Sequence, residues 1–253
     1  MGEAVAACMV LNAVGGYPSE TIMCAHASMI DEAPDSRSRE VDFERARHQL
    51  VETLRTQGIR DLRVLSALDR VPRHEFVHPR HAHEAYGNYA LPIGHGQTIS
   101  QPYIVALMTE LLDTTTGDRI LEVGTGSGYQ TAVLAELGCD VYTVEIIGGL
   151  ADRASETLSR LGYRGVHQLV GDGHLGWPEH APFDGLIVTA APTVVPEALV
   201  GQVDDGNLVA PVGAIDATQE LLRLEKDGSG RLVRHAVAPV RFVPLVSPRP
   251  NNV

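Results

Sequence analysis

The stretch LEVGTGSGYQ, residues 121–130, joins a short apolar segment to a helical pattern through three glycines. The segment RILEV, residues 119–123, is short and mostly apolar with β-branched residues, which is typical of a buried strand. Gly124 and Gly126 let the backbone turn tightly and approach a ligand, because glycine carries no side chain. The stretch therefore predicts a strand, a ligand-binding turn and a helix, in that order.

The alternation of strand and helix continues downstream of this turn. Strand-like segments lie at residues 119–123, 140–145, 166–170 and 185–189, with helical segments between the first three. This alternation predicts βαβ units and hence a doubly wound α/β fold with a mostly parallel sheet. After Asp205 the pattern changes, and residues 219–236 predict an antiparallel hairpin that closes one edge of the sheet.

A helical preface precedes the sheet. Apolar residues recur at helical spacing over 43–54 and again over 62–68, where Asp61 can cap the second helix and Pro72 ends it. Residues 31–40 are charged and contain Pro and Ser, which predicts a linker. We therefore expect residues 1–41 to be a weakly ordered N-terminal extension and residues 42–253 to form the folded domain.

Net charge and cysteine content argue against several classes of protein. The chain has 20 Lys and Arg against 32 Asp and Glu, and this net charge of −12 argues against attraction to nucleic acid or to an anionic membrane. Its three cysteines have no C-x-x-C spacing, so neither a disulfide framework nor a zinc site is expected. The apolar residues 4–14 are too few to span a bilayer and lack a positive region before them. We expect a cytoplasmic protein that acts as a monomer.

Two acidic residues follow the next two strand-like segments. Glu145 ends the second, about 20 residues after Gly124, where a carboxylate can accept from both ribose hydroxyls; a solvated strand end is the alternative. Asp172, in GDG at 171–173, could accept from an adenine amino group or form only an Asp-Gly turn. Tyr129 stands where a dinucleotide fingerprint has its third glycine. A glycine turn with these acids and no phosphate-binding Lys favours S-adenosylmethionine.

Five longer segments carry a family resemblance: residues 90–112, 120–137, 171–173, 182–192 and 241–245. With these, the sequence resembles the protein-L-isoaspartate O-methyltransferases over about residues 42–245, and GQTISQP at 96–102 points to this family in particular. The resemblance implies a seven-stranded class I methyltransferase sheet whose last two strands are exchanged relative to the usual order. It also implies methyl transfer from S-adenosylmethionine to the α-carboxylate of L-isoaspartyl residues in damaged proteins and peptides, which starts repair through a succinimide.

The resemblance assigns the site residue by residue. Ser100 is the family's active-site serine, and we add Thr98 beside it as a second catalytic residue. The implied cofactor residues are Gly124, Thr125, Gly126, Ser127, Gly128, Glu145, Asp172 and Gly173, and we add Gln97 and Ile99 because they lie in the same loop as Ser100. The implied substrate-binding residues are Ile93, Gly94, Ala190, Ala191 and Pro192, and no metal is implied. Two departures stand out, namely Asn88 where many members have Asp, and Asp205 where a Gly-Gly pair is usual.

Ser100 has two possible roles. An acceptor carboxylate is already ionised at pH 7, so the reaction needs no general base, and we expect the Ser100 hydroxyl to orient that carboxylate. Ser100 also precedes Pro102 and a helical pattern, where it could serve as an N-cap. His78, His81 and His83 are expected to lie in a solvated loop rather than to bind a metal.

Three other functions stay open at this stage. One is a peptide-tailoring carboxylate methyltransferase with a dedicated acceptor. The second is an adenosine-binding regulator without catalysis, against which the presence of Ser100, Glu145 and Asp172 counts. The third is a nicotinamide dehydrogenase, which Tyr129 disfavours.

Overall fold

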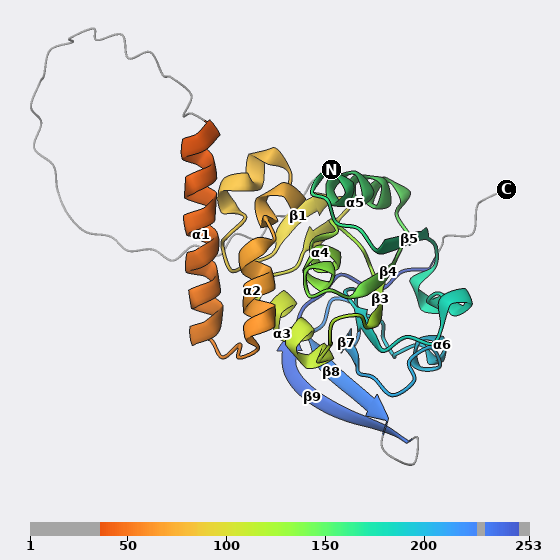
Figure 1. Cartoon of the computed structure of the whole chain (residues 1–253). Helices are drawn as coiled ribbons and strands as arrows, with labels where there is room; N and C mark the ends of the chain where they lie inside the picture. Colours follow the sequence, from red (N-terminus) through yellow and green to blue (C-terminus); the bar gives the residue numbers. More distant parts are fainter. Residues whose placement is uncertain (1–35, 227–230, 248–253) are drawn as a thin grey trace, which may run out of the picture. The chain divides into compact units, whose positions relative to one another are not determined.

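The computed structural model describes residues 36–226 and 231–247. Within these ranges no helix has the length and apolar character needed to cross a membrane. Figure 1 shows a central sheet with helices packed against it and a long hairpin at one edge.

Seven strands form the central sheet in the order β5-β4-β3-β6-β7-β8-β9. Their bounds are β3 (Arg119–Val123), β4 (Asp140–Glu145), β5 (Val166–Val170), β6 (Gly185–Val188), β7 (Leu208–Val212), β8 (Gln219–Lys226) and β9 (Leu232–Val240). The pairs from β5 to β7 are parallel, whereas β8 and β9 are antiparallel. This order confirms the doubly wound fold and the exchange of the last two strands, because β8 lies between β7 and β9.

Both faces of the sheet are covered. The helices are α1 (Ser36–Thr56), α2 (Leu62–Arg70), α3 (Pro102–Leu112), α4 (Tyr129–Glu136), α5 (Gly148–Arg160) and α6 (Glu197–Val200). Successive strand residues point to opposite faces, so Ile120 packs with α3 and α4 while Leu121 packs with α6 on the other side. The preface helices α1 and α2 lie side by side (Figure 1) and share an apolar cluster with α3, α4 and α5.

Short elements connect the preface to the sheet, namely the 3-10 helices η1 (Arg73–Phe76) and η2 (Pro79–Glu84) and the strands β1 (Leu91–Gly94) and β2 (Gln97–Ile99). Two further 3-10 helices, η3 (Gly173–Leu175) and η4 (Pro178–His180), lie between β5 and β6. In η2, His81 pairs with Glu84 and His78 accepts from the backbone N–H of Arg80.

Residues 91–99 form an antiparallel hairpin. Its two-residue loop has positive φ at both positions, 53° at His95 and 70° at Gly96, which is the conformation that matches the twist of paired strands. The family-specific segment at 96–102 therefore begins in the loop of this hairpin and continues through its second strand. The hairpin lies at one end of the sheet and presents Gln97 to Ser100 there.

One boundary differs from the sequence-based prediction. Helix α1 begins at Ser36, inside the segment 31–40 that we assigned to a linker. Arg and Glu are good helix formers, so a charged composition does not distinguish a linker from a solvated helical turn. Residues 1–35 lie outside the described part, and the extension stays a prediction.

The predicted N-cap of α2 is confirmed, because Asp61 accepts from the backbone N–H of Arg63 at 2.8 Å. We expect Asp61→Ala to lower the free energy of unfolding by about 1 kcal/mol, and Asp61→Asn to lower it by much less, because Asn keeps the capping oxygen. Urea unfolding of both variants measures the difference. Equal losses would assign the effect to the ion pair between Asp61 and Arg63 instead of the cap.

Candidate active site

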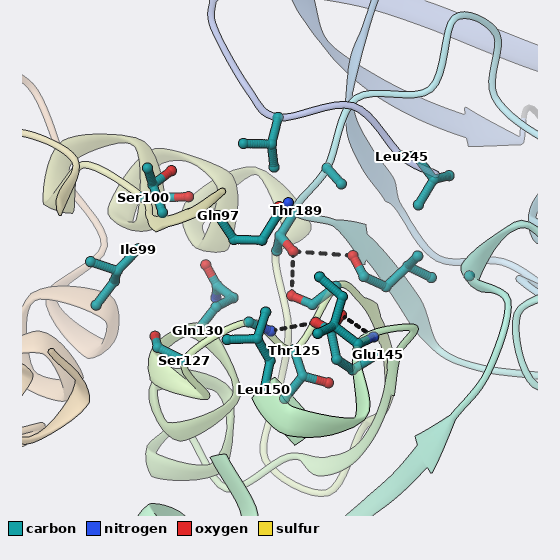
Figure 2. A pocket seen from close by; sticks show the side chains of 18 of the residues that line it. Gln97, Ile99, Ser100, Thr125, Ser127, Gln130, Glu145, Leu150, Thr189 and Leu245 are labelled. Atoms are coloured by element: carbon teal, nitrogen blue, oxygen red, sulfur yellow. Dashed lines mark hydrogen bonds between the residues drawn. The ribbon is translucent and has the colours of Figure 1, made fainter. Parts of the chain in front are cut away.

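A cleft opens at the carboxyl ends of β3, β4 and β6, where the strand order of the sheet reverses and where ligands bind in doubly wound folds. The glycine turn after β3, the hairpin strand β2, the loop after β6 and residues 243–246 line it (Figure 2). These segments are far apart in sequence, and the sheet brings them to one edge.

The turn after β3 needs glycine at two positions. Gly124 has a φ of 102° and Gly126 a φ of 56°, both in the region that favours glycine. A Cβ on Gly124 would also lie 2.4 Å from the hydroxyl of Thr189, which donates to the carbonyl of Gly124. The end of β6 thus packs directly against the turn and leaves its other side to a ligand.

Glu145 joins this turn to the end of β4. The backbone N–H of Gly126 donates to its Oε2 at 2.8 Å, and the N–H of Ile147 donates to its Oε1 at 2.9 Å (Figure 2). The side chain is buried, and both oxygens keep a free lone pair. The carboxylate is therefore held rigidly at the cleft, in a state suited to accept from two neighbouring hydroxyls.

A second acidic residue, Glu122, lies beneath the turn. Its Oε2 accepts from the hydroxyls of Thr131 at 2.5 Å and Thr143 at 2.8 Å, and Thr143 also bonds Thr125 in the turn. Burial raises the pKa of Glu122 to about 8, and the nearby charge of Glu145 adds to the rise. Sequence reasoning missed this group, although an acidic residue inside an otherwise apolar strand was a visible signal.

Ser100 lines the cleft but does not cap helix α3. The N-cap position of α3 is Gln101, which makes no side-chain cap bond. The Oδ1 of Asn88 accepts from the backbone N–H of Tyr103 at 3.0 Å instead, so a distant loop caps the helix. The N-cap prediction for Ser100 is wrong, because the chain stays extended for one residue more than the spacing indicated.

Most of the predicted site residues meet at the cleft. Those that line it are Gln97, Thr98, Ile99, Ser100, Gly124, Thr125, Gly126, Ser127, Glu145, Gly173 and Ala190. Because no ligand is present, this placement supports their assigned roles, which stay predictions.

The other predicted residues lie beside the cleft. A Cβ on Gly128 would meet Ala154 and Leu158 of α5, at 3.3 Å from each. The Oδ1 of Asp172 accepts from the backbone N–H of His174 at 3.0 Å, as in the simple turn that we weighed against an adenine contact. Neither residue is among those that line the cleft, and ligand contact by either one stays a prediction.

Several of the predicted substrate-binding residues form contacts within the protein. The side chain of Ile93 packs next to Gly126, and Gly94 follows it at the hairpin loop. The N–H of Ala191 donates to the carbonyl of Val243, and its carbonyl accepts from the N–H of Leu245. The carbonyl of Pro192 accepts from the N–H of Gly213. Of these segments only Ala190 lines the cleft, and substrate binding by the others stays a prediction.

Several lining residues were not predicted. They are Val105, Met108, Val123, Tyr129, Gln130, Val144, Ile146, Ile147, Leu150, Thr189, Val243, Pro244, Leu245 and Val246. The apolar pair after Glu145 and the segment RFVPL at 241–245 were visible signals. Among the described residues that line the cleft none is Lys, Arg or His, so its walls suit an uncharged adenosine better than a phosphate.

A second groove adjoins the cleft. It shares Thr98, Ser100, Thr189 and Val243 with the cleft and continues over the loop at 88–90, Thr218 and residues 239–242. Arg241 is exposed in this groove, and no Asp or Glu is among the described residues that line it. Ser100 and Thr98 therefore lie at the boundary between the cleft and this groove.

Comparison with known proteins identifies relatives over most of the chain. The model of the family described as Protein-L-isoaspartate(D-aspartate) O-methyltransferase matches residues 45–249. The protein-L-isoaspartate O-methyltransferase of Gloeobacter violaceus is 51% identical over 202 residues, which cover 79% of this chain and 98% of that protein. The enzyme of the same name from Alkalilimnicola ehrlichii is 54% identical over 204 residues, covering 80% and 92%.

A solved structure agrees with these matches. The putative protein-L-isoaspartate O-methyltransferase of Plasmodium falciparum, in complex with S-adenosyl-L-homocysteine, superposes with a TM-score of 0.70 at 25% identity. The alignment covers 80% of this chain and 99% of that chain.

Glu122 predicts a specific dependence of stability on pH. Its pKa of about 8 in the folded protein lies above the ordinary glutamate pKa of 4.5, so its stabilising contribution is complete below about pH 4.5 and is lost as pH rises through 8. We expect Glu122→Gln to remove this loss while keeping an oxygen for Thr131 and Thr143. Between pH 5 and 8 the wild type should lose stability relative to the variant, by up to about 1.4 kcal/mol per pH unit. Parallel curves of unfolding free energy against pH would contradict the assignment.

Proposed function

The chain belongs to the protein-L-isoaspartate O-methyltransferase family, and we propose that its cleft transfers the methyl group of S-adenosylmethionine to the α-carboxylate of L-isoaspartyl residues in damaged proteins and peptides. The main support for this proposal is the position of Ser100 and Thr98, which line both the cleft beside the glycine turn and the adjoining groove. A transferase needs such a boundary, because its two reactants must meet there.

The cleft supports the assignment of the cofactor. Glu145 offers two fixed oxygens to the ribose hydroxyls, while Ile146, Ile147 and Leu150 offer apolar surface to the adenine. The turn at Gly124 and Gly126 lets the backbone approach the ligand closely. When bound, S-adenosylmethionine supplies an electrophilic methyl group on a sulfonium.

The chain's own task is then to place the acceptor. The α-carboxylate of the substrate, with a pKa of roughly 3.5, is ionised at pH 7 and needs no base. The hydroxyls of Ser100 and Thr98 donate hydrogen bonds that orient it, and the apolar walls exclude water. Holding two reactants in near-attack geometry can lower a barrier by about 7–11 kcal/mol in favourable cases. The site therefore acts by positioning the acceptor carboxylate, and the mechanism needs no catalytic triad.

The methyl ester that forms is a better acyl electrophile than the carboxylate, because methanol can leave from its carbonyl carbon. Attack on this carbonyl by the next backbone nitrogen expels methanol and closes a succinimide, whose hydrolysis returns part of the material to normal aspartate. On this proposal the partners are proteins and peptides that contain isoaspartate. A monomeric, cytoplasmic enzyme remains our expectation.

Labelled methyl transfer to an isoaspartyl peptide and to its normal-aspartyl twin tests the function. We expect label in the first peptide only. The free carboxylate of isoaspartate is attached directly to Cα, whereas that of a normal aspartyl residue is separated from Cα by a methylene group. Several isoaspartyl peptides of unrelated sequence should all react. Reaction with only one of them would favour the peptide-tailoring alternative, and equal labelling of both twins would contradict the repair function.

Ser100→Ala tests the role of the hydroxyl. We expect the rate of methyl transfer to fall at least tenfold, which corresponds to about 1.4 kcal/mol, because the acceptor loses an orienting donor. Affinity for S-adenosylmethionine and the melting temperature should both stay close to the wild-type values, since Asn88 and not Ser100 caps α3. A lowered melting temperature with unchanged turnover would leave Ser100 a structural role only.

A further inference from the structure

Arg73, in the 3-10 helix η1, is a buried cation whose partners are carbonyl oxygens and an aromatic ring. Only 1% of its surface is exposed. Its Nε donates to the carbonyl of Ala85 and its Nη2 donates to the carbonyl of Ser100, both at 2.8 Å. Its guanidinium lies 4.8 Å from the ring centroid of Tyr129.

Burial of a charge without a carboxylate partner is costly. Desolvation lowers the pKa of Arg73 to about 10, which still leaves the group charged at pH 7. Core packing alone does not account for this charge, because an apolar side chain of similar volume would fill the space without the cost of desolvation. The positions of its three partners suggest a different use.

Two of the partners of Arg73 belong to the two halves of the site. Ser100 stands where the cleft meets the adjoining groove, and Tyr129 begins α4 directly behind the glycine turn and lines the cleft. The third partner, Ala85, lies at the end of η2. The guanidinium thus connects the serine of the acceptor side with the helix of the cofactor side.

We propose that Arg73 is a positioning residue for methyl transfer, which fixes the Ser100 hydroxyl relative to the glycine turn by gripping the Ser100 carbonyl while it stacks on Tyr129. The inference rests on the proposed function of Ser100. A misplacement of a catalytic group by about 1 Å can reduce a rate on the order of a hundredfold. A hydrogen bond that holds the backbone of Ser100 in place therefore matters for turnover. Lysine cannot replace these contacts, because an ammonium group lacks the planar guanidinium geometry that bonds two carbonyls and stacks on a ring.

Arg119 is a matched control outside the site. Its Nη1 and Nη2 donate to the carbonyls of Pro182 and His180, and its guanidinium lies 5.1 Å from the ring centroid of Tyr142. It begins β3, at the end of the strand opposite to the glycine turn. Arg119→Lys therefore removes the same kinds of contact without touching Ser100.

The experiment compares kcat and KM of Arg73→Lys and Arg119→Lys at temperatures equally far below their melting midpoints. We expect Arg73→Lys to lower kcat at least tenfold, with the KM for S-adenosylmethionine changed less than threefold, and Arg119→Lys to keep kcat within twofold of the wild type. Arg73→Met removes the buried charge and keeps the aliphatic volume, so it serves if the lysine variant does not fold. It should lose at least as much kcat. Wild-type kcat in a folded Arg73 variant would overturn the proposal.

A double-mutant cycle separates positioning from general damage. If Arg73 acts through the Ser100 hydroxyl, Arg73→Lys should cost less than threefold in a Ser100→Ala background, against at least tenfold in the wild type. Equal costs in both backgrounds would overturn the inference and leave the proposed function intact, because the wild type would still methylate isoaspartyl peptides. A wild type that methylates no isoaspartyl peptide would overturn both.

Discussion

The carboxylate of Glu145 joins the two loops on which the site depends. By accepting from the N–H groups of Gly126 and Ile147, it fixes the turn after β3 against the start of α5. Parallel pairing of β3 with β4 makes this possible, since it brings Val123 level with Val144 and places both loops at one edge of the sheet. Beneath the turn, Glu122 and its threonine partners form a buried polar layer that supports the same geometry.

The two halves of the site are built differently. The cleft that suits the adenosine is formed mostly by residues that directly follow strands, so its geometry comes from the sheet. The groove beside it combines a hairpin, the loop at 88–90 and residues 239–243, which end the last strand and follow it, and these segments meet only in the folded chain. Asn88 illustrates the dependence, because it caps α3 from outside that helix and so helps to place the segment that contains Ser100. An aspartate at this position would offer the same capping oxygen.

Prediction from sequence succeeded where a residue's role depends on its neighbours in the chain. The strands 119–123, 140–145 and 166–170 and the cap at Asp61 are local features, and the structure confirms them. It failed at the N-terminus of α3, where Ser100 has the right residue type and spacing for a cap but the chain turns one residue later. The beginning of α1 at Ser36 was missed for a related reason, since charged residues are common in linkers and in solvated helices alike.

The sequence by itself determined the order of strands and helices, the glycine turn and the family, because periodicity, turn chemistry and long motifs are properties of neighbouring residues. Only the tertiary structure decided which of the motif residues face the cleft. Gly128 and Asp172 belong to the same motifs as Gly126 and Gly173, yet packing against α5 and a local turn direct them elsewhere. The link from Arg73 to Ser100 and Tyr129 was equally invisible, because burial of a cation between distant segments leaves no local pattern in a sequence.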